Sequence, residues 1–385
     1  MSIDHHSPSL ELLRTDPYPV LAGLRRTAPV AWIEALGGWI VTRYDLAVQV
    51  LHDAATFTVE DPRFSTGRVV GPSMLSLDGT EHTRHRQPFG TAFRHSQIGN
   101  TFEAWLPGEA RSIVRGFAGN GRAELRRSLA GPLAVSVMIR ALDLAAVTPT
   151  DLLGWYDSIV NEVDQISSGR ELGLEGPQAM ASLTEALGST GSNSLLKVAT
   201  GHLTATEVAS NAAVLLFGGI ETAEGMTTNL AWHLLSESTR LDAVRGRPEL
   251  VGDAIEESLR LEPAAARVDR YATRSVEIGG AHIDRGDLVI VSLTGANRDP
   301  DQFADPDNFD LSRANARTHL TFAQGPHACL GSHLARMESA AAITACLDLL
   351  PDLRLDRERS SPPSGLVFRK PAALWVEWGP PLGSL

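Results

Sequence analysis

The sequence predicts a mainly helical fold with small β-sheets, and three observations support this prediction. Between Glu81 and about Leu235, apolar residues recur at spacings of three and four, which is the pattern of amphipathic helices. Short alternating or β-branched runs occur before and after this stretch. Hydrophobic residues make up 43% and charged residues 21% of the 385-residue chain, the balance of a globular protein with a substantial core.

The first and last thirds of the chain carry the β-type segments. A helical pattern at 21–26 precedes two runs typical of strands, 30–33 and 38–44. Short β-branched runs return at 276–278 and 288–291, separated by turn glycines. We therefore expect small sheets beside a helical body.

Two further segments are rich in turn-forming residues. The region 167–194 contains many glycines and serines around one helical run at 177–187, which fits either a mobile lid or an ordinary surface loop. A polar loop at 297–316 contains two Asp-Pro pairs. Because compact domains rarely keep so long a loop without a reason, we expect it to have a structural or functional role.

Charge and cysteine content argue against several classes of function. A net charge of −12 disfavours a general nucleic-acid or anionic-membrane binder, since both partners are polyanions. Two cysteines, Cys329 and Cys346, are too few for a disulfide framework and fit a reducing compartment. The first ten residues lack the pattern of a signal peptide, and no run of about 18 apolar residues is present to cross a bilayer. We expect a cytoplasmic protein.

The strongest chemical signal surrounds Cys329. The segment 322–331 reads FAQGPHACLG and precedes a helical run at 332–350. A cysteine directly before a helix lies where free amides and the positive end of the helix dipole stabilise a thiolate, the form that binds a metal. Gly325 and Gly331 would let the backbone turn tightly and approach a flat cofactor. A buried structural cysteine is the alternative, and it is the interpretation that we favour for Cys346.

A second signal lies inside the apolar helical run 208–235, where residues 217–222 read FGGIET. Two adjacent glycines, Gly218 and Gly219, cost a helix about 1 kcal/mol each relative to alanine. This cost indicates that something approaches the backbone closely at this point.

The pattern Phe-x-x-Gly-x-His-x-Cys-x-Gly resembles the haem-binding loop of cytochromes P450. Three further stretches match that family in the right order: 82–86 (HTRHR), 217–222 and 257–260 (ESLR). The resemblance extends from about residue 16 to residue 378. It implies a single cytochrome P450 domain over residues 1–385, mainly α with small β-sheets, that binds haem b.

The resemblance also implies roles for individual residues. Cys329 would be the metal ligand, and Glu221 and Thr222 would be the acid-alcohol pair that delivers protons, with Ala223 replacing a threonine common in the family. Charge-assisted bonds to the haem carboxylates explain the types of four of the expected cofactor-binding residues. The full expected set is Cys329, His82, Arg86, Arg270, His327, Gly325, Gly331, Phe322, Gly218 and Gly219.

A pair of charged residues in the matching stretch 257–260 is expected to be structural. Glu257 and Arg260 lie three apart on one helical face. In the family, the corresponding pair is buried and joins an arginine of the long loop. Arg313 and Arg317 are the candidates for that third member.

The implied activity is that of a monooxygenase, an oxidoreductase that inserts one oxygen atom from O2 into a small or medium-sized, largely apolar substrate, in secondary metabolism. A thiolate ligand favours cleavage of the dioxygen bond. The sequence contains no flavin or iron–sulfur motif, so NAD(P)H electrons must arrive through a ferredoxin and its reductase. Arg84, Arg94 and Arg336 are expected to form a basic patch for this acidic partner. We expect a monomer.

The expected substrate pocket is apolar. By position in the family, its lining comprises Val214, Phe217, Ala265, Ala266, Arg267, Leu366, Val367 and part of 69–75. Arg267 would be a substrate-carboxylate anchor, a partner of a haem carboxylate or a surface residue.

Other functions fit parts of the pattern. The same oxidant could couple two rings or desaturate a substrate, and peroxide could replace reductive activation, although peroxide-driven relatives lack the acid-alcohol pair. A haem sensor without turnover would need no proton relay. A non-haem protein with a structural cysteine would leave the four ordered motifs unexplained.

Overall fold

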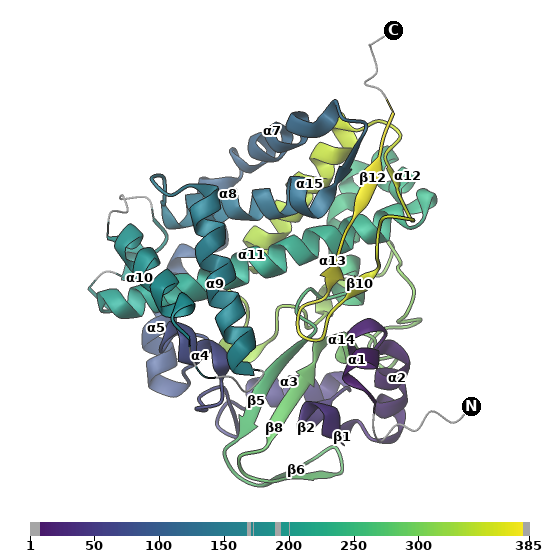
Figure 1. The fold of residues 1–385 in the computed structure, drawn as a ribbon. Helices are drawn as coiled ribbons and strands as arrows, with labels where there is room; N and C mark the ends of the chain where they lie inside the picture. Colours follow the sequence, from purple (N-terminus) through teal and green to yellow (C-terminus); the bar gives the residue numbers. More distant parts are fainter. Residues whose placement is uncertain (1–7, 168–170, 172, 189–193, 200, 380–385) are drawn as a thin grey trace.

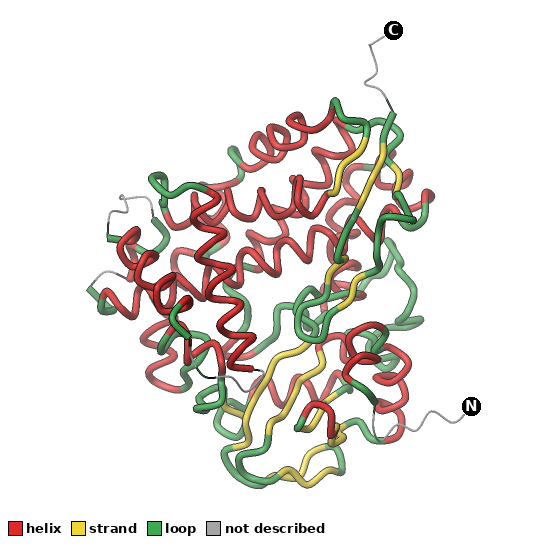
Figure 2. Tube along the Cα trace, viewed as in Figure 1, coloured by secondary structure: helices red, strands yellow, loops and turns green. Residues whose placement is uncertain are grey.

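The computed structural model describes residues 8–379 apart from 168–170, 172, 189–193 and 200. Its architecture is mainly helical, with small sheets that lie beside the helical body (Figure 1). Figure 2 shows the strands gathered around the N-terminal helices and along one edge of the body. The predicted fold class is therefore confirmed. Among the described residues, no helix is long and apolar enough to cross a membrane.

The longest helix, α11, passes through the middle of the helical body (Figure 1). It begins at a capping box, in which Thr204 and Glu207 each accept the other's backbone N–H. The larger helices of the body are α5 (Gly79–Ala92), α7 (Leu106–Ala118), α8 (Gly131–Leu142), α9 (Pro149–Ser167), α10 (Glu175–Leu187), α11 (Ala205–Leu235), α13 (Val251–Leu261) and α15 (Ser332–Leu349). Because α11 packs against α8, α13 and α15, its side chains are buried on several faces.

Shorter helices connect these elements. They are α1 (Leu10–Thr15), α2 (Tyr18–Thr27), α3 (Tyr44–His52), α4 (Ser65–Val70), α6 (His95–Phe102), α12 (Ser238–Gly246) and α14 (Leu293–Ala296). Single 3₁₀ turns occupy Glu34–Leu36, Lys197–Ala199, Pro248–Leu250, Ala316–Thr318 and Gly325–His327, and a π-helical turn, Arg126–Ala130, leads into α8.

The largest sheet has the strand order β1-β2-β8-β5-β3. Its strands are β1 (Val30–Ile33), β2 (Gly38–Val41), β3 (Phe57–Thr58), β5 (Arg267–Ala272) and β8 (Leu288–Ser292). Only the pair β2 and β8 is parallel. The predicted strand at 38–44 is too long, because the backbone N–H of Tyr44 donates to the Asp299 carboxylate at 2.8 Å and α3 begins there.

Three smaller sheets complete the β structure of the described residues. One contains β4 (Arg122–Glu124), β12 (Trp375–Glu377) and β9 (Arg354–Leu355) in that order. The other two are the pairs β10 (Pro363–Ser364) with β11 (Lys370–Pro371), and β6 (Val276–Ile278) with β7 (Ala281–Ile283).

The long loop at 297–316 wraps around a buried ion-pair cluster formed by Glu257, Arg260 and Arg313. Glu257 and Arg260 are both fully buried and form two hydrogen bonds of 2.8 Å with each other. Arg260 also donates to three backbone carbonyls of the loop, at 2.7–3.0 Å. Arg313 joins Glu257 at 3.0 Å, whereas Arg317 is 69% exposed and lies near Glu256. The loop therefore has a structural role, and Arg313 is the third member of the cluster.

The glycine-rich region 167–194 falls partly outside the described residues. Within the described part, the predicted helical run is confirmed as α10. The buried carboxylate of Glu162, in α9, accepts the backbone N–H groups of Gly173 and Gly176. These bonds tie the start of α10 to α9.

Candidate active site

A cavity of about 280 Å³ lies between the loop that carries Cys329 and the middle of α11. Its lining is predominantly apolar and includes Met74, Leu75, Val214 and Leu215. The loop contributes Phe322 and residues 327–331. The structure therefore brings the two strongest sequence signals, the cysteine loop and the Gly-Gly-x-x-Thr segment, to one cavity.

Cys329 lines this cavity. Its backbone N–H donates to the carbonyl of Phe322 at 2.8 Å, which closes the loop. Burial raises the pKa of the thiol, while amide donors of Gly331 and Ser332 and the charges of Arg86 and Arg336 act in the opposite direction. The side chain nevertheless has accessible surface, and it lines the cavity. Those amides are the donors expected at a helix start, and they would favour a thiolate ligand.

The second cysteine is confirmed as a core residue. Cys346 is 1% exposed in α15, and burial raises the pKa of its thiol to about 12. Cys329 is therefore the described thiol that can reach a ligand in the cavity.

The two glycines of the cysteine loop, Gly325 and Gly331, differ in what a side chain would contact at each position. Gly325 has a φ of +71°, and a methyl group there would overlap the backbone of Leu51. Gly331 has an ordinary negative φ, and a methyl group there would meet open space. The close approach at Gly325 is thus to the chain itself, whereas the open space at Gly331 belongs to the cavity that it lines.

The two adjacent glycines of α11, Gly218 and Gly219, differ in the same way. A methyl group on Gly219 would overlap the sulfur of Met138 in α8, so this glycine is required by helix packing. Gly218 has no atom within 4 Å of the corresponding position. Beside it, the hydroxyl of Thr222 donates to the carbonyl of Gly218 at 2.5 Å, and all three residues line the cavity.

Two histidines lie beside the cysteine loop: His327 lines the cavity, and His82, which is not among the lining residues, packs against it. The rings of His82 and His327 lie 4.3 Å apart, and Asp78 pairs with His327 at 2.8 Å. Nε2 of His82 and Nδ1 of His327 are buried without a hydrogen-bond partner among the described residues. Burial lowers the pKa of His82 to about 4. Such unpartnered buried nitrogens mark a place where a missing polar group can bind.

The two arginines expected near the haem carboxylates lie in different positions. Arg86 lines the cavity and donates to the carbonyl of Ala328 in the cysteine loop. Arg270 is 4% exposed and donates to the carbonyl of Asp269 at 2.8 Å, but it is not among the residues that line the cavity. Burial lowers the pKa of both guanidinium groups.

Glu221 does not face the cavity that Thr222 lines. Its two carboxylate oxygens accept from Lys370 Nζ at 2.7 Å and from the hydroxyl of Tyr156 at 2.6 Å. The acid and the alcohol of the expected pair thus have different surroundings, and the sequence patterns did not indicate Tyr156 or Lys370.

Glu338 is a further residue that the sequence patterns missed. It is 2% exposed and lines the cavity from α15, and its Oε1 has no hydrogen-bond partner among the described residues. Burial raises its pKa to about 8. The sequence spacing could have indicated it. Glu338 follows Gly331 by seven residues, which is two helical turns, so both lie on the helical face that also carries Leu334 and Ala335 and lines the cavity.

Only some of the expected substrate residues line the cavity. Val214 and Ala265 line the cavity, as do Met74 and Leu75 from the segment 69–75. Phe217 is not among the lining residues and packs edge-on against Phe368.

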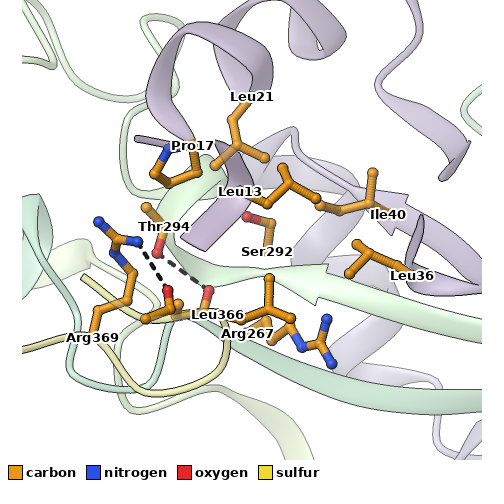
Figure 3. Close-up of a pocket in the computed structure, with 12 residues that line it drawn as sticks. Leu13, Pro17, Leu21, Leu36, Ile40, Arg267, Ser292, Thr294, Leu366 and Arg369 are labelled. Carbon is orange, nitrogen blue, oxygen red and sulfur yellow. Dashed lines mark hydrogen bonds between the residues drawn. The ribbon is translucent and has the colours of Figure 1, made fainter. Parts of the chain in front are cut away.

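Ala266, Arg267 and Leu366 line a separate pocket of about 30 Å³ bounded by N-terminal residues (Figure 3). Nε and Nη1 of Arg267 have no hydrogen-bond partner there, although an Asp269 carboxylate oxygen lies 3.5 Å from Nε. Val367 is 36% exposed and lines neither space.

The three arginines expected in a basic patch have unequal partners. Arg84 pairs with Glu81 and Glu207, and Arg336 pairs with Glu256 at 2.6 Å. Arg94 is exposed and has no charged partner among the described residues.

Comparisons with known proteins match this architecture. The family model described as "Cytochrome P450" matches residues 246–364. The cytochrome P450 monooxygenase PikC of Streptomyces venezuelae is 31% identical, over 89% of this chain and 85% of that protein. The nocardicin C N-oxygenase of Nocardia uniformis subsp. tsuyamanensis is 32% identical, over 94% and 96% respectively. The crystal structure of P450BioI in complex with a fatty-acid-ligated acyl carrier protein has a TM-score of 0.86 at 28% identity, covering 96% of this chain and all of that chain.

The fold and these relatives define an oxidoreductase of the monooxygenase class. More specifically, the chain belongs to the cytochrome P450 family. Members of this family bind haem iron and receive electrons from external redox partners. The cavity fits haem: Cys329 has accessible surface there, two buried histidine nitrogens lack partners, and Gly218 and Gly331 leave open space.

Proposed function

We propose that this protein is a haem-thiolate monooxygenase that inserts one oxygen atom from O2 into a small or medium-sized, largely apolar organic molecule of secondary metabolism. The observation that carries this proposal is that Cys329 opens onto an apolar cavity on which Gly218 and Thr222 also lie. A relative named for the oxidation of a particular organic molecule, the nocardicin C N-oxygenase, supports the assignment of a small organic substrate.

Residues around the cavity would hold the haem. Cys329 would be the iron ligand, and the amides of Gly331 and Ser332 would stabilise its thiolate. His82, His327 and Arg86 would bind the haem carboxylates, and Arg270 would add positive charge from β5. When bound, a thiolate-ligated haem supplies dioxygen activation.

The chain itself would supply protons and exclude water. Thr222 presents its hydroxyl at the cavity and would pass protons into it, and Glu221 would replenish them. The apolar lining from Val214, Ala265 and Met74 would keep water away and bind the substrate. Thr222→Ala should therefore raise the fraction of consumed oxygen that is released as peroxide.

Electron supply would come from NAD(P)H through a ferredoxin and its reductase. Arg94 is the strongest candidate for docking, because Arg84 and Arg336 are already paired with glutamates. An unpaired exposed cation contributes more to steering an acidic partner than a neutralised one.

The test is a pair of cysteine variants examined in the reduced, carbon monoxide-bound form. The wild-type protein should show a Soret band shifted far to the red, which thiolate ligation produces. Cys329→Ala should lose this band, because its ligand is removed, and Cys346→Ala should keep it. A thiolate-type band in Cys329→Ala, or a colourless wild-type protein, would contradict the proposed function.

A further inference from the structure

Two asparagines of α11, Asn211 and Asn229, are 0% exposed, and each ties the helix to another part of the chain. A buried carboxamide needs hydrogen-bond partners, so its contacts show what it holds in place. Asn229 donates to the backbone carbonyls of Glu262 and Arg369, both at 3.0 Å. Neither of these two residues lines the cavity. Asn211 instead contacts a segment that does.

The orientation of the Asn211 amide follows from its neighbours. Its Oδ1 accepts the backbone N–H of Met74 at 2.9 Å, and its Nδ2 donates to the carbonyl of Glu207 at 2.7 Å. The same Nδ2 lies 3.0 Å from Nδ1 of buried His85, in α5, and can donate its second hydrogen there. A reversed amide would place a donor against an N–H and an oxygen against a carbonyl. Asn211 thus joins α11, α5 and the segment before α5.

The segment 71–77 connects α4 to α5 and forms part of the cavity wall, because Met74 and Leu75 both line the cavity. The bond from Met74 to Asn211 ties this segment to α11. Among the described residues, the other hydrogen bonds of 71–77 stay within the segment or reach the adjoining α4. One side chain of α11 therefore carries the hydrogen bonding that fixes this part of the wall.

The loss of that bond would change the position of the wall. Met74 is 5% exposed, so without the Asn211 oxygen its backbone N–H would be buried and unpaired. A buried donor without an acceptor costs free energy, and the segment relieves this cost when Met74 moves toward water. Because Leu75 lies next in the chain, it moves with Met74. The cavity would then be wider on this side.

We propose that Asn211 is a positioning residue that determines the size of the substrate, because it holds the wall formed by Met74 and Leu75 against the cavity. This inference rests on the proposed monooxygenase function. Asn211 does not line the cavity and acts only through the wall. In the wild type the wall excludes bulky molecules and packs against compact apolar ones. Without the bond, the wall withdraws and bulkier molecules fit.

The variants separate the bond to Met74 from the rest of the side chain. Asn211→Leu has nearly the same shape but no polar atom, and Asn211→Ala removes the same contacts with a smaller side chain if the leucine variant does not fold. Asn211→Asp keeps an oxygen for Met74, and its second oxygen can accept from Nδ1 of His85. Asn229→Leu is the matched control, because it removes an equally buried carboxamide from the same helix without touching the cavity wall.

The first measurement is hydrogen exchange of the segment 71–77, followed by mass spectrometry. Exchange should be about tenfold faster or more in Asn211→Leu and Asn211→Ala, because the Met74 N–H loses its acceptor. Asn211→Asp should stay close to the wild type, and Asn229→Leu should leave this segment unchanged. The bond involves no haem, so the measurement reports on the wall in haem-bound and haem-free protein alike.

The second measurement compares two azoles that bind haem iron through a nitrogen atom. Imidazole needs only the iron, whereas clotrimazole also brings three aryl rings into the cavity. The ratio of the clotrimazole to the imidazole dissociation constant should fall by about tenfold in Asn211→Leu, because the wall no longer opposes the rings. Asn211→Asp and Asn229→Leu should keep the wild-type ratio. A loss of stability alone does not change this ratio, since both ligands bind the same folded protein.

The outcomes distinguish this proposal from the proposed function. Unchanged exchange of 71–77 in Asn211→Leu and Asn211→Ala would overturn the positioning role. Faster exchange with an unchanged azole ratio, or an equal change of the ratio in Asn229→Leu, would overturn the role in substrate size. A missing thiolate-type carbon monoxide band would instead overturn the proposed function, while the exchange measurement would still decide whether Asn211 holds the wall.

Discussion

The Glu257–Arg260–Arg313 cluster and the cavity lined by Cys329 differ in whether their buried polar groups have hydrogen-bond partners. In the cluster, fully buried Arg260 donates to the Glu257 carboxylate and to three loop carbonyls, and the same carboxylate accepts from Arg313. Around the cavity, nitrogens of His82 and His327 and an oxygen of Glu338 have no partner among the described residues.

This difference distinguishes structural from ligand-binding polarity. Burying a polar group without a hydrogen bond costs free energy, so a protein that leaves several such groups around one space gains from a ligand that pairs with them. A satisfied cluster gains nothing from a ligand. The same types of side chain therefore stabilise the fold in one region and prepare a binding site in the other.

The largest expected effect is the loss of one member of the satisfied cluster. Arg260→Ala would leave the Glu257 carboxylate buried with much of its compensation removed, which costs about 3–5 kcal/mol of the free energy of unfolding. Denaturant unfolding measures this loss. Arg354→Ala removes an exposed ion pair of the same 2.8 Å length and should cost less than about 1 kcal/mol. Equal losses in the two variants would contradict the structural role of the cluster.

Local patterns located the Glu257–Arg260 pair and the cysteine loop, whereas the burial of the pair and its link to a loop arginine followed from the resemblance to cytochromes P450. Glu257 and Arg260 lie on one helical face, and the glycines and cysteine of 322–331 lie within ten residues of one another. The mainly helical fold class and the positions of β1, β2, β6 and β8 followed from periodicity, whereas the other strands of the described residues were not predicted. The choice between Arg313 and Arg317 required the path of the long loop, which the sequence patterns do not specify.

Contacts between distant segments could not be predicted. The partners of Glu221 come from α9 and β11, and no local pattern links either to α11. The sequence also did not show which side chains of an extended segment point into the cavity. Ala265 lines the cavity while its neighbour Ala266 lines the other pocket, because successive side chains of an extended chain point to opposite sides. Matching a segment to its position in the family shows that the segment passes near the cavity, but it does not show on which side of the segment each side chain lies.

The next effect concerns Glu338, the buried carboxyl group that lacks a partner. Its folded pKa of about 8 exceeds the ordinary value of 4.5, so folding favours the protonated form. The stability that this group contributes is complete below about pH 4.5 and is lost as the pH rises toward 8. Glu338→Gln keeps the shape without the ionisation and should raise the free energy of unfolding by about 3 kcal/mol near neutral pH.

Unfolding experiments between about pH 5 and pH 8 test this sign. The advantage of Glu338→Gln over the wild type should grow as the pH rises. Exposed Glu185, on the surface of α10, provides the control, and Glu185→Gln should show no such trend. A constant difference across the pH range would mean that Glu338 has a polar partner and does not belong with the unsatisfied groups of the cavity.

The smallest expected effect distinguishes the adjacent glycines Gly218 and Gly219 of α11. Gly218→Ala places a methyl group in open space and should stabilise haem-free protein by about 1 kcal/mol, the helix propensity gained. Gly219→Ala gains the same propensity, but its methyl group overlaps the sulfur of Met138, so overpacking should produce a net loss of about 1 kcal/mol. Denaturant unfolding of both variants checks the opposite signs. If Gly218→Ala also destabilised haem-free protein, the space beside it would be filled by the protein itself. A stabilised variant would show that Gly218 is kept at a cost to the fold, which is the behaviour of a residue that reserves room for a ligand.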